Sequence, residues 1–314
     1  MKIAILSRYQ ETINRGAETF VRELAGQLAR THEVEILSGD RSDSLPFILK
    51  GNYQIVISIN GGRQSFKASL GRILGKYKLV ITGQAGIGRG ERFNLLVKPD
   101  LYVALTEYMF KWAKKWAWGT KVIKIPNGVD KRKFSPKGEK MDFKLPKPVI
   151  LSVGALVWYK HHERVIKAVS NLKEGSLLIV GEGPQREELE KMGGRLLKGR
   201  FGIIKANFID MPKVYRGADL FSLPSWEREA FGIVYIEAMA SGLGVVAPDD
   251  LARREIVGEA GILTDVSDTK EYANAIKKAL MINWKERSLK QSQNFSWEKA
   301  REKYNRAFEE LIKK

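Results

Sequence analysis

The sequence predicts an α/β protein made of two doubly wound domains, each built on a parallel sheet. Short apolar runs alternate with amphipathic segments of helical length along the whole chain, which is the pattern of such sheets. The 314 residues are 44% hydrophobic, which is enough for about two domains. A polar stretch punctuated by Pro and Gly, residues 131–148, separates two sets of apolar runs and is expected to link the domains.

Ten apolar runs are expected to be strands. The first set is Ile3–Leu6, Val34–Leu37, Ile55–Ile59, Leu79–Thr82 and Leu101–Leu105. The second set is Val149–Val153, Leu177–Val180, Leu220–Leu223, Val245–Ala247 and Gly261–Leu263. Two Rossmann-like domains that face each other across a cleft follow from this pattern, with ligands expected at the carboxyl ends of the strands.

Helices are expected between the strands and at the end of the chain. The first begins near Gly16 and carries Phe20, Val21, Leu24, Ala25 and Leu28 on one apolar stripe, as a core-facing helix should. The expected domain boundaries are 1–143 for the first domain and 144–295 for the second. Residues 296–314 are expected to form a helix, from about Trp297 to Ile312, that returns to the first domain.

The segment Pro224–Gly244 is the most informative part of the chain because it holds two carboxylates, Glu229 and Glu237, eight residues apart. Ser225 is a candidate cap, and Ile233–Ala240 is rich in helix-forming residues. A helix that starts near Phe231 directs free N–H groups and partial positive charge outward, and so can bind phosphate without a metal. The alternative is an ordinary amphipathic helix with two solvated glutamates.

Several motifs resemble, in order, those of the retaining glycosyltransferases of family four, a group with the GT-B fold. These motifs are Met1–Ser7, Arg15–Ala25, Ile125–Asp130 with Phe134–Pro136, Ser152–Lys160, Leu178–Pro184, Gly217–Asp219, the two-glutamate segment, and Glu255–Val257 with Gly261–Leu263. The resemblance covers roughly the whole chain. It implies transfer of a sugar from a nucleotide-diphosphate sugar to an acceptor hydroxyl, with retention of configuration and without a metal cofactor.

The resemblance also implies roles for individual residues. Glu229 would contact the donor sugar, Glu237 would contact the ribose, and Lys160 would neutralise the leaving diphosphate. The diphosphate and base would be held by backbone groups and turns at Gly16, Gly181, Glu182, Gly183, Phe231, Gly232 and Ile233. The alternatives are a solvated lysine at Lys160, a helix-start glycine at Gly16, and a tight turn at 181–184.

The chain departs from the family pattern at two positions. Ala155 stands where many members have an arginine, so that Lys160 alone remains of a cationic pair. Gln84 stands where many members have an acceptor-domain histidine. Glutamine cannot act as a base, but in a retaining mechanism the diphosphate itself can take the proton of the acceptor, so catalysis rests mainly on positioning and charge stabilisation.

Composition indicates a cytoplasmic enzyme. No apolar run approaches the roughly 18 residues that cross a bilayer, and the N-terminal run is too short for a signal peptide. The absence of cysteine excludes disulfides and thiol catalysis, and fits a reducing compartment. The three histidines, His32, His161 and His162, show no metal-binding spacing.

Positive charge is concentrated in the expected acceptor domain. Residues 51–128 hold 13 Lys and Arg residues against three acidic residues, a net charge of +10 within the +18 of the chain. Residues 62–78 read as a basic amphipathic helix, in which Arg63 and Lys67 are candidate acceptor residues, and residues 107–118 combine three tryptophans with three lysines. This composition favours a lipid-linked acceptor and peripheral binding to an anionic membrane on its cytoplasmic face. The alternative is a core-facing helix with a solvated basic back.

Other functions fit the sequence less well. Nucleic-acid binding would explain the pI of 9.8, but no nucleic-acid-binding motif is present, and the donor motifs would have no purpose. A sugar-phosphate synthase, a nucleotide-sugar epimerase, or a non-catalytic GT-B partner subunit remains an alternative. The donor sugar, the base and the acceptor are not determined by the sequence.

Overall fold

The computed structural model describes residues 1–12 and 16–313, which form two compact units. The first unit comprises Met1–Gly128, Arg228–Phe231 and Trp297–Lys314, and the second comprises Val129–Glu227 and Gly232–Ser296. The first boundary therefore falls after Gly128, earlier than the sequence suggested. The polar stretch 131–148 belongs to the second unit.

Aromatic and backbone contacts tie this polar stretch to the second unit. Phe134 is buried and packs edge-on against the rings of Phe208 and Tyr215, with centroids 6.3 and 5.7 Å away. Further along, the Arg216 guanidinium donates to the carbonyl of Glu139 at 2.7 Å. Composition alone suggested a free linker because one buried ring in a lysine-rich run is a weak signal.

The first unit is built on a six-stranded parallel sheet. Its strands are β1 (Lys2–Ser7), β2 (Glu33–Ser38), β3 (Ile55–Ser58), β4 (Lys78–Thr82), β5 (Leu101–Ala104) and β6 (Lys121–Lys124), in the order β2-β1-β3-β4-β5-β6. Its helices are α1 (Gly16–Leu28), the short 3-10 helix η1 (Gly39–Asp43), α2 (Leu45–Lys50), α3 (Arg63–Gly75), α4 (Arg89–Leu96), α5 (Glu107–Trp116) and α13 (Trp297–Ile312).

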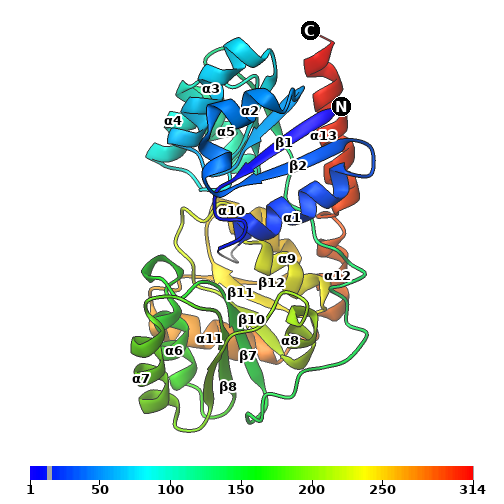
Figure 1. Ribbon diagram of the computed structural model, residues 1–314. Helices are drawn as coiled ribbons and strands as arrows, with labels where there is room; N and C mark the ends of the chain where they lie inside the picture. The colour runs from blue at the N-terminus through cyan, green and yellow to red at the C-terminus, as the bar shows by residue number, and fades with distance from the viewer. Residues whose placement is uncertain (13–15, 314) are drawn as a thin grey trace. The chain divides into compact units, whose positions relative to one another are not determined.

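Helices cover both faces of this sheet. Figure 1 shows α2, α3, α4 and α5 gathered on one side, with α1 and α13 on the other. The last helix packs on the first: the rings of Phe20 and Trp297 are 5.9 Å apart, and His32 hydrogen-bonds Asn305 at 3.0 Å. The expectation that the C-terminal helix returns to the first domain is confirmed.

The second unit is built on a second six-stranded parallel sheet. Its strands are β7 (Val149–Val153), β8 (Ser176–Val180), β9 (Phe201–Ile204), β10 (Leu220–Ser222), β11 (Val245–Pro248) and β12 (Gly261–Thr264), in the order β12-β11-β10-β7-β8-β9. Its helices are η2 (Trp158–Lys160), α6 (His162–Ser170), α7 (Arg186–Leu197), α8 (Met211–Gly217), α9 (Ile233–Ala240), α10 (Leu251–Val257), η3 (Gly258–Ala260), α11 (Thr269–Leu280) and α12 (Lys285–Ser292).

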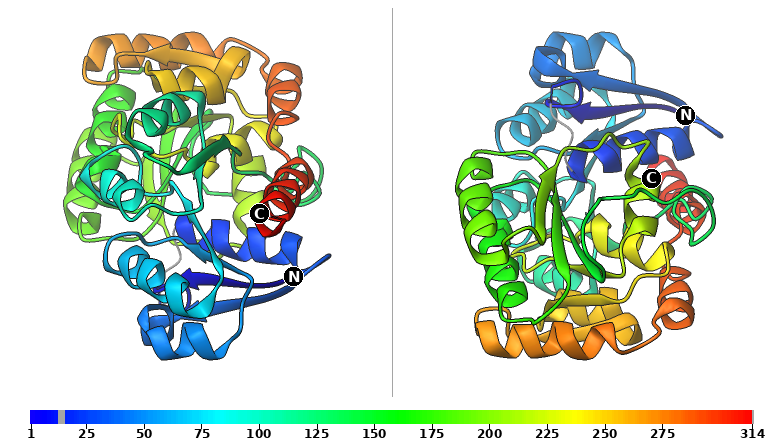
Figure 2. Two further views of the ribbon diagram at one scale, coloured as in Figure 1. Left: turned by 90° about the horizontal axis from the view of Figure 1, so that it is seen from above. Right: turned by 90° about the horizontal axis from the view of Figure 1, so that it is seen from below.

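The core of the second unit lies between the sheet and the α6, α7 and α11 helices. Ile150, Ile166 and Ile179 are among its fully buried residues, and Tyr272 of α11 packs in the same cluster. The right-hand view in Figure 2 shows α6 and α7, in green, on one side of this sheet and α9, in yellow, on the other. Within the described ranges, none of the helices is both long and apolar enough to cross a bilayer.

All ten expected strands are present, each within one residue of its expected ends. Two further strands, β6 and β9, lie at the edges of the two sheets and were not expected from the sequence. Their residues are only partly buried or exposed. Edge strands need fewer apolar residues, and β6 begins and ends with lysine while β9 contains a glycine, so neither gives the usual pattern.

Candidate functional site

The strand order of the second sheet places a topological switch point at its carboxyl edge. The chain winds outward in opposite directions from the central strands β7 and β10, which are adjacent. At such a switch point the loops after the two strands diverge, and ligands of doubly wound proteins bind between them. The loop 154–161 follows β7 and the loop 223–232 follows β10, so the sequence motifs that contain Lys160 and Glu229 both fall at this point of the topology.

Lys160 ends the short helix η2 after β7, and its backbone N–H donates to the Val157 carbonyl at 3.0 Å. The next residue, His161, has a φ of 53°, which turns the chain sharply into α6. The backbone N–H of Trp226, from the β10 loop, donates to the Tyr159 carbonyl at 3.0 Å, and the two rings lie 5.3 Å apart. These contacts join the two switch-point loops within the second unit.

His162, two residues after Lys160, is fully buried. Its Nδ1 is 3.1 Å from the Ser152 hydroxyl, and its Nε2 has no hydrogen-bond partner among the described residues. Burial, with the nearby charge of Lys160 as a second cause, lowers the pKa of His162 to about 3. The imidazole is therefore neutral near pH 7, and Lys160 rather than His162 carries the positive charge of this loop.

Two glycines after β8 are required by close packing. A Cβ at Gly181 would lie 1.9 Å from the Gly154 carbonyl oxygen, and one at Gly183 would lie 2.4 Å from the Leu156 carbonyl oxygen. The loops also exchange backbone hydrogen bonds, including Leu156 N–H to the Glu182 carbonyl at 2.8 Å. The side chain of Glu182 is exposed and pairs with Lys205 at 2.8 Å. The turn thus locks the β7 and β8 loops together.

Helix α9 begins at Ile233, two residues after the expected start. Gly232 precedes it with a φ of 79°, a left-handed conformation that glycine adopts without strain. The interpretation of Ser225 as the helix cap is wrong, because Ser225 lies well before the helix and is buried. Instead, the carbonyl of Ser225 accepts a hydrogen bond at 3.0 Å from the fully buried Arg253 of α10.

Glu237 lies in the second turn of α9 and is buried. The hydroxyl of Tyr215, from α8, donates to its carboxylate at 2.7 Å. Burial, followed by the adjacent Glu237 charge, holds the pKa of Tyr215 well above its ordinary value, so the phenol remains a donor. The reading of Glu237 as a solvated helix glutamate is therefore wrong: its carboxylate is held in one position by a buried partner.

Glu229 and Phe231 lie in the short segment Arg228–Phe231, which groups with the first unit. Glu229 is partly exposed and Phe231 is buried. Their predicted roles in holding the donor stay predictions.

In the first unit, Gly16 is the exposed first residue of α1, and a Cβ there would meet no atom within 4 Å. Packing therefore does not explain this glycine. The residue before it in the sequence motif, Arg15, lies outside the described residues.

Gln84 is held in place by an amide pair. Its Nε2 donates to Asn127 Oδ1 at 3.2 Å, and Asn127 belongs to the Pro-Asn-Gly motif of the first unit. The same loop is anchored by the buried Glu91, which accepts from the Ala85 N–H at 3.2 Å and from the Tyr102 hydroxyl at 2.8 Å. Burial raises the pKa of Glu91. Arg63 and Lys67, the other acceptor candidates, lie exposed on α3.

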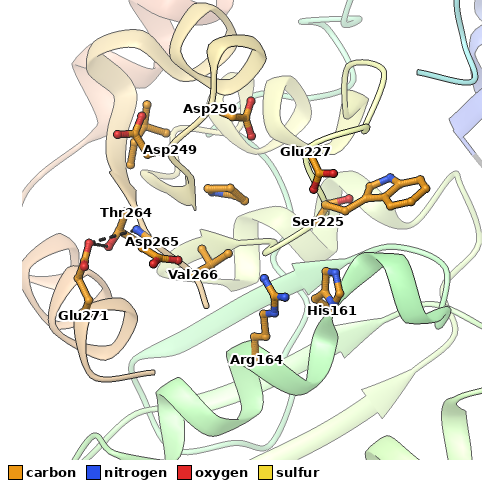
Figure 3. Close-up of a pocket in the computed structure, with 13 residues that line it drawn as sticks. His161, Arg164, Ser225, Glu227, Asp249, Asp250, Thr264, Asp265, Val266 and Glu271 are labelled. Carbon is orange, nitrogen blue, oxygen red and sulfur yellow. Dashed lines mark hydrogen bonds between the residues drawn. The ribbon is translucent and has the colours of Figure 1, made fainter. Parts of the chain in front are cut away.

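A cavity of about 460 Å³ opens at the carboxyl ends of β10, β11 and β12. Figure 3 shows Arg164 and His161 on one side of it, opposite Asp249 and Asp250. None of the predicted site residues lines this cavity, although His161 and Ser225, from the two switch-point loops, do.

Three residues that were not expected from the sequence hold predicted site residues or their loops in place. Tyr215, Asn127 and Arg253 each fix a predicted residue or its loop through one or two hydrogen bonds. Asn127 was within a recognised motif. Tyr215 and Arg253 gave no sequence signal, because a buried partner from another helix leaves no spacing pattern.

Comparison with solved structures identifies the fold as GT-B, two Rossmann-like domains in one chain. The chain is similar to sucrose-phosphate synthase from Thermosynechococcus elongatus, with a TM-score of 0.83 and 19% identity over 99% of both chains. It is also similar to the Anabaena protein HepE in complex with UDP and glucose, with a TM-score of 0.79 and 18% identity over 99% of this chain and 100% of that one.

Sequence comparison finds a family match in the second unit and several more distant relatives. Residues 147–281, within the second unit, match the family model of the glycosyl transferases group 1. Sulfoquinovosyl transferase of Arabidopsis thaliana is 27% identical over 49% of this chain. Phosphatidyl-myo-inositol mannosyltransferase of Mycobacterium tuberculosis is 29% identical over 57%. The chain spans 32% of the plant relative and 49% of the mycobacterial one.

Proposed function

We propose that this protein is a retaining, metal-independent glycosyltransferase of family four, which moves a sugar from a nucleotide-diphosphate sugar to an acceptor hydroxyl. The observation that carries the proposal is the switch point of the second unit. It brings the Lys160 loop, the glycine turn after β8 and the start of α9 to one sheet edge, and residues 147–281 around it match a glycosyltransferase family.

In the proposed reaction, the bond between the sugar C1 and the diphosphate oxygen breaks, and the acceptor oxygen forms a new bond to C1 on the same face. The leaving diphosphate takes the proton of the acceptor hydroxyl, so no protein base is required. Negative charge grows on the diphosphate as this bond breaks. Lys160 and the free N–H groups at the start of α9 are the groups that stabilise it.

The buried carboxylate of Glu237 is suited to a ribose. One of its oxygens accepts from Tyr215, and a carboxylate has further acceptor capacity for hydroxyl groups. Glu229 is proposed to contact the donor sugar. A UDP donor is consistent with the UDP bound to the structurally similar HepE.

The acceptor is proposed to be lipid-linked or a precursor of a cell-surface glycan. The +10 net charge of residues 51–128 and the phosphatidyl-myo-inositol mannosyltransferase among the relatives support an anionic lipid acceptor. Gln84, Arg63 and Lys67 are the proposed acceptor contacts. The protein would then work at the cytoplasmic face of a membrane.

Calorimetric titration with UDP, GDP and ADP, each with and without EDTA, tests the donor site. We expect one nucleotide to bind saturably and independently of EDTA. Lys160→Ala and Glu237→Ala should each weaken binding about tenfold or more, since each removes a charged hydrogen-bonding partner.

Lys191→Ala is the matched control for Lys160→Ala, because Lys191 is an exposed lysine of α7 that pairs with Glu187 at 2.6 Å. It should leave nucleotide affinity unchanged. If none of the three nucleotides binds, or if EDTA abolishes binding, the proposed metal-independent donor site is wrong.

A further inference from the structure

Helix α3 exposes its apolar face to solvent and buries small and polar residues. Its apolar residues Phe66, Leu70, Ile73 and Leu74 form one stripe at helical spacing, and all four are exposed, with Ile73 at 75% and Leu74 at 70%. Its buried residues are Gln64, Ser65, Ala68 and Gly71. The alternative from the sequence, a core-facing helix with a solvated basic back, is therefore wrong: the apolar face points to solvent.

Specific contacts fix the helix in this rotation. The Ser58 hydroxyl, at the end of β3, donates to Gln64 at 2.9 Å and lies 3.0 Å from the Ser65 hydroxyl. The Tyr77 hydroxyl donates to the Ala68 carbonyl at 2.5 Å. A Cβ at Gly71 would lie 2.6 Å from the same hydroxyl, so Tyr77 needs a small residue there. Turning the apolar stripe inward would break all of these contacts.

The exposed apolar surface continues onto two neighbouring helices. Ser69 and Arg72 of α3 hydrogen-bond the carbonyls of Val97 and Lys98, at the end of α4, each at 2.8 Å. Leu96 and Phe93 of α4 are exposed, as are Trp116 and Trp118 at the end of α5. The Arg92 guanidinium lies 3.6 Å above the Trp116 ring and joins α4 to α5. We call the α3 stripe together with these four residues the outer face: Phe66, Leu70, Ile73, Leu74, Phe93, Leu96, Trp116 and Trp118.

Exposed basic side chains lie on or next to the helices that carry the outer face. Arg63, Lys67 and Lys76 are exposed on or next to α3, and none of them forms an ion pair with another described residue. Arg89, Lys114 and Lys115 add further exposed positive charge on α4 and α5. Exposed large apolar residues ringed by lysine and arginine, with tryptophan at one end, suit the boundary between headgroups and acyl chains of an anionic bilayer.

We propose that the outer face docks on an anionic membrane, with Ile73 and Leu74 entering the headgroup boundary and the surrounding lysines contacting lipid phosphates. The charge complementarity argues for a lipid surface rather than a second copy of the chain, because two copies would bring these unpaired positive charges together. The docking does not depend on transfer chemistry.

The position of α3 indicates how docking would bring a lipid acceptor to the protein, and this step rests on the proposed function. The helix starts with Arg63, after a short loop, residues 59–62, that follows β3 at the carboxyl edge of the first sheet. There the Gly62 N–H donates to Asn94 at 3.2 Å, and Asn94 donates in turn to the Glu91 that anchors the Gln84 loop. A lipid headgroup held at Arg63 would thus lie at the edge where the proposed acceptor residues are, while its acyl chains stay in the bilayer.

Sedimentation with vesicles tests the docking. The full chain, without nucleotide, is mixed with vesicles of phosphatidylcholine and phosphatidylglycerol, or of phosphatidylcholine alone. We expect binding to the anionic vesicles that weakens as salt is raised. Ile73→Ser/Leu74→Ser should lower the partition coefficient at least about tenfold, and Lys67→Gln/Lys76→Gln should lower it about fivefold per charge removed.

The matched control is Met281→Ser/Ile282→Ser, an adjacent exposed apolar pair in the second unit, which should bind as the wild type does. Equal partitioning of all variants, or no binding to anionic vesicles, overturns the docking proposal. So does a dimer in sedimentation velocity that Ile73→Ser/Leu74→Ser dissolves, because the outer face would then bind a second copy. Nucleotide titration of the same variants separates the two proposals, since it reports on the donor site alone.

Discussion

Helices α3 and α6 hold similar places in the two units, since each leads from one central strand to the next, yet they bury opposite kinds of residue. In α6 the apolar residues Val165, Ile166 and Val169 are fully buried against the second sheet. In α3 the apolar stripe faces solvent, and polar or small residues face the first sheet. An amphipathic pattern therefore identifies a helix but does not decide which face is inside.

The carboxyl edges of the two sheets also differ in how their loops are held. In the second unit, glycines let the β7 and β8 loops interlock through backbone contacts, as at Gly181. In the first unit, the buried carboxylate of Glu91 holds the loop that carries Gln84 by accepting a hydrogen bond from the Ala85 N–H. Under the proposed function, backbone packing would give the donor side a rigid frame, whereas a side-chain network would leave more room for the acceptor side to vary.

Paired substitutions in α6 and α3 test the comparison most strongly. Ile166→Glu places a charge in the core of the second unit and should destabilise it by about 4 kcal/mol or more. Ile73→Glu should change the free energy of unfolding by no more than about 0.5 kcal/mol, because the side chain is already in water. Denaturant unfolding followed by circular dichroism measures both. Comparable destabilisation by Ile73→Glu would mean that the outer face is covered in solution.

Alanine substitutions at two glycines distinguish a glycine that the fold requires from one that the fold does not require. Gly181→Ala should destabilise the second unit by about 3 kcal/mol, because the added methyl would overlap the Gly154 carbonyl. Gly16→Ala meets open space and should stabilise α1 by about 0.5 kcal/mol. Thermal unfolding gives both values. If Gly16→Ala is as stable as expected but slows transfer, the glycine serves the substrate rather than the fold.

Most of the fold could be predicted from the sequence because buried strands have a strong local signal. Runs such as Ile3–Leu6 and Val149–Val153 are apolar throughout, and the structure confirms them. The rotation of α3 could not be predicted, because Tyr77 and Ser58, which fix it, lie on other elements. Likewise, the sequence did not show that residues 131–148 belong to the second unit, because this depends on the packing of Phe134 against Tyr215.

Candidate site residues could be named, but their surroundings could not. The family motifs pointed to Glu237 and Gln84, and the structure adds the partner of each, Tyr215 and Asn127. Hydrogen bonds between residues 22 or 43 positions apart leave no pattern in a single sequence. The glycine turn at 181–184, which had two readings, is a packing requirement whatever ligand it also contacts.

The buried His162 predicts a pH dependence that belongs to the second unit. Its folded-state pKa of about 3 is below the ordinary value of 6.5, so between these values the unfolded chain binds a proton that the folded chain does not. The stability that this group contributes is complete above about pH 6.5. It decreases as the pH is lowered below that value, by up to about 1.4 kcal/mol per pH unit. His162→Asn should flatten this slope in denaturant unfolding at a series of pH values. An unchanged slope would show that His162 does not titrate in the unfolding reaction.

A pair of tyrosine substitutions tests whether Tyr215 positions the Glu237 carboxylate or only stabilises the second unit. Tyr215→Phe removes the hydroxyl that donates to Glu237 and should cost about 1 kcal/mol of stability and several-fold in nucleotide affinity, because the carboxylate loses its fixed position. Tyr235→Phe removes a hydroxyl that donates to the Leu223 carbonyl at 2.8 Å, so it should cost similar stability. Its nucleotide affinity should stay unchanged. Calorimetric titration gives the nucleotide affinity of both variants, and thermal unfolding gives their stability. If Tyr215→Phe binds the nucleotide as tightly as Tyr235→Phe does, Tyr215 supports the second unit only as a packed side chain, and Glu237 does not contact the nucleotide.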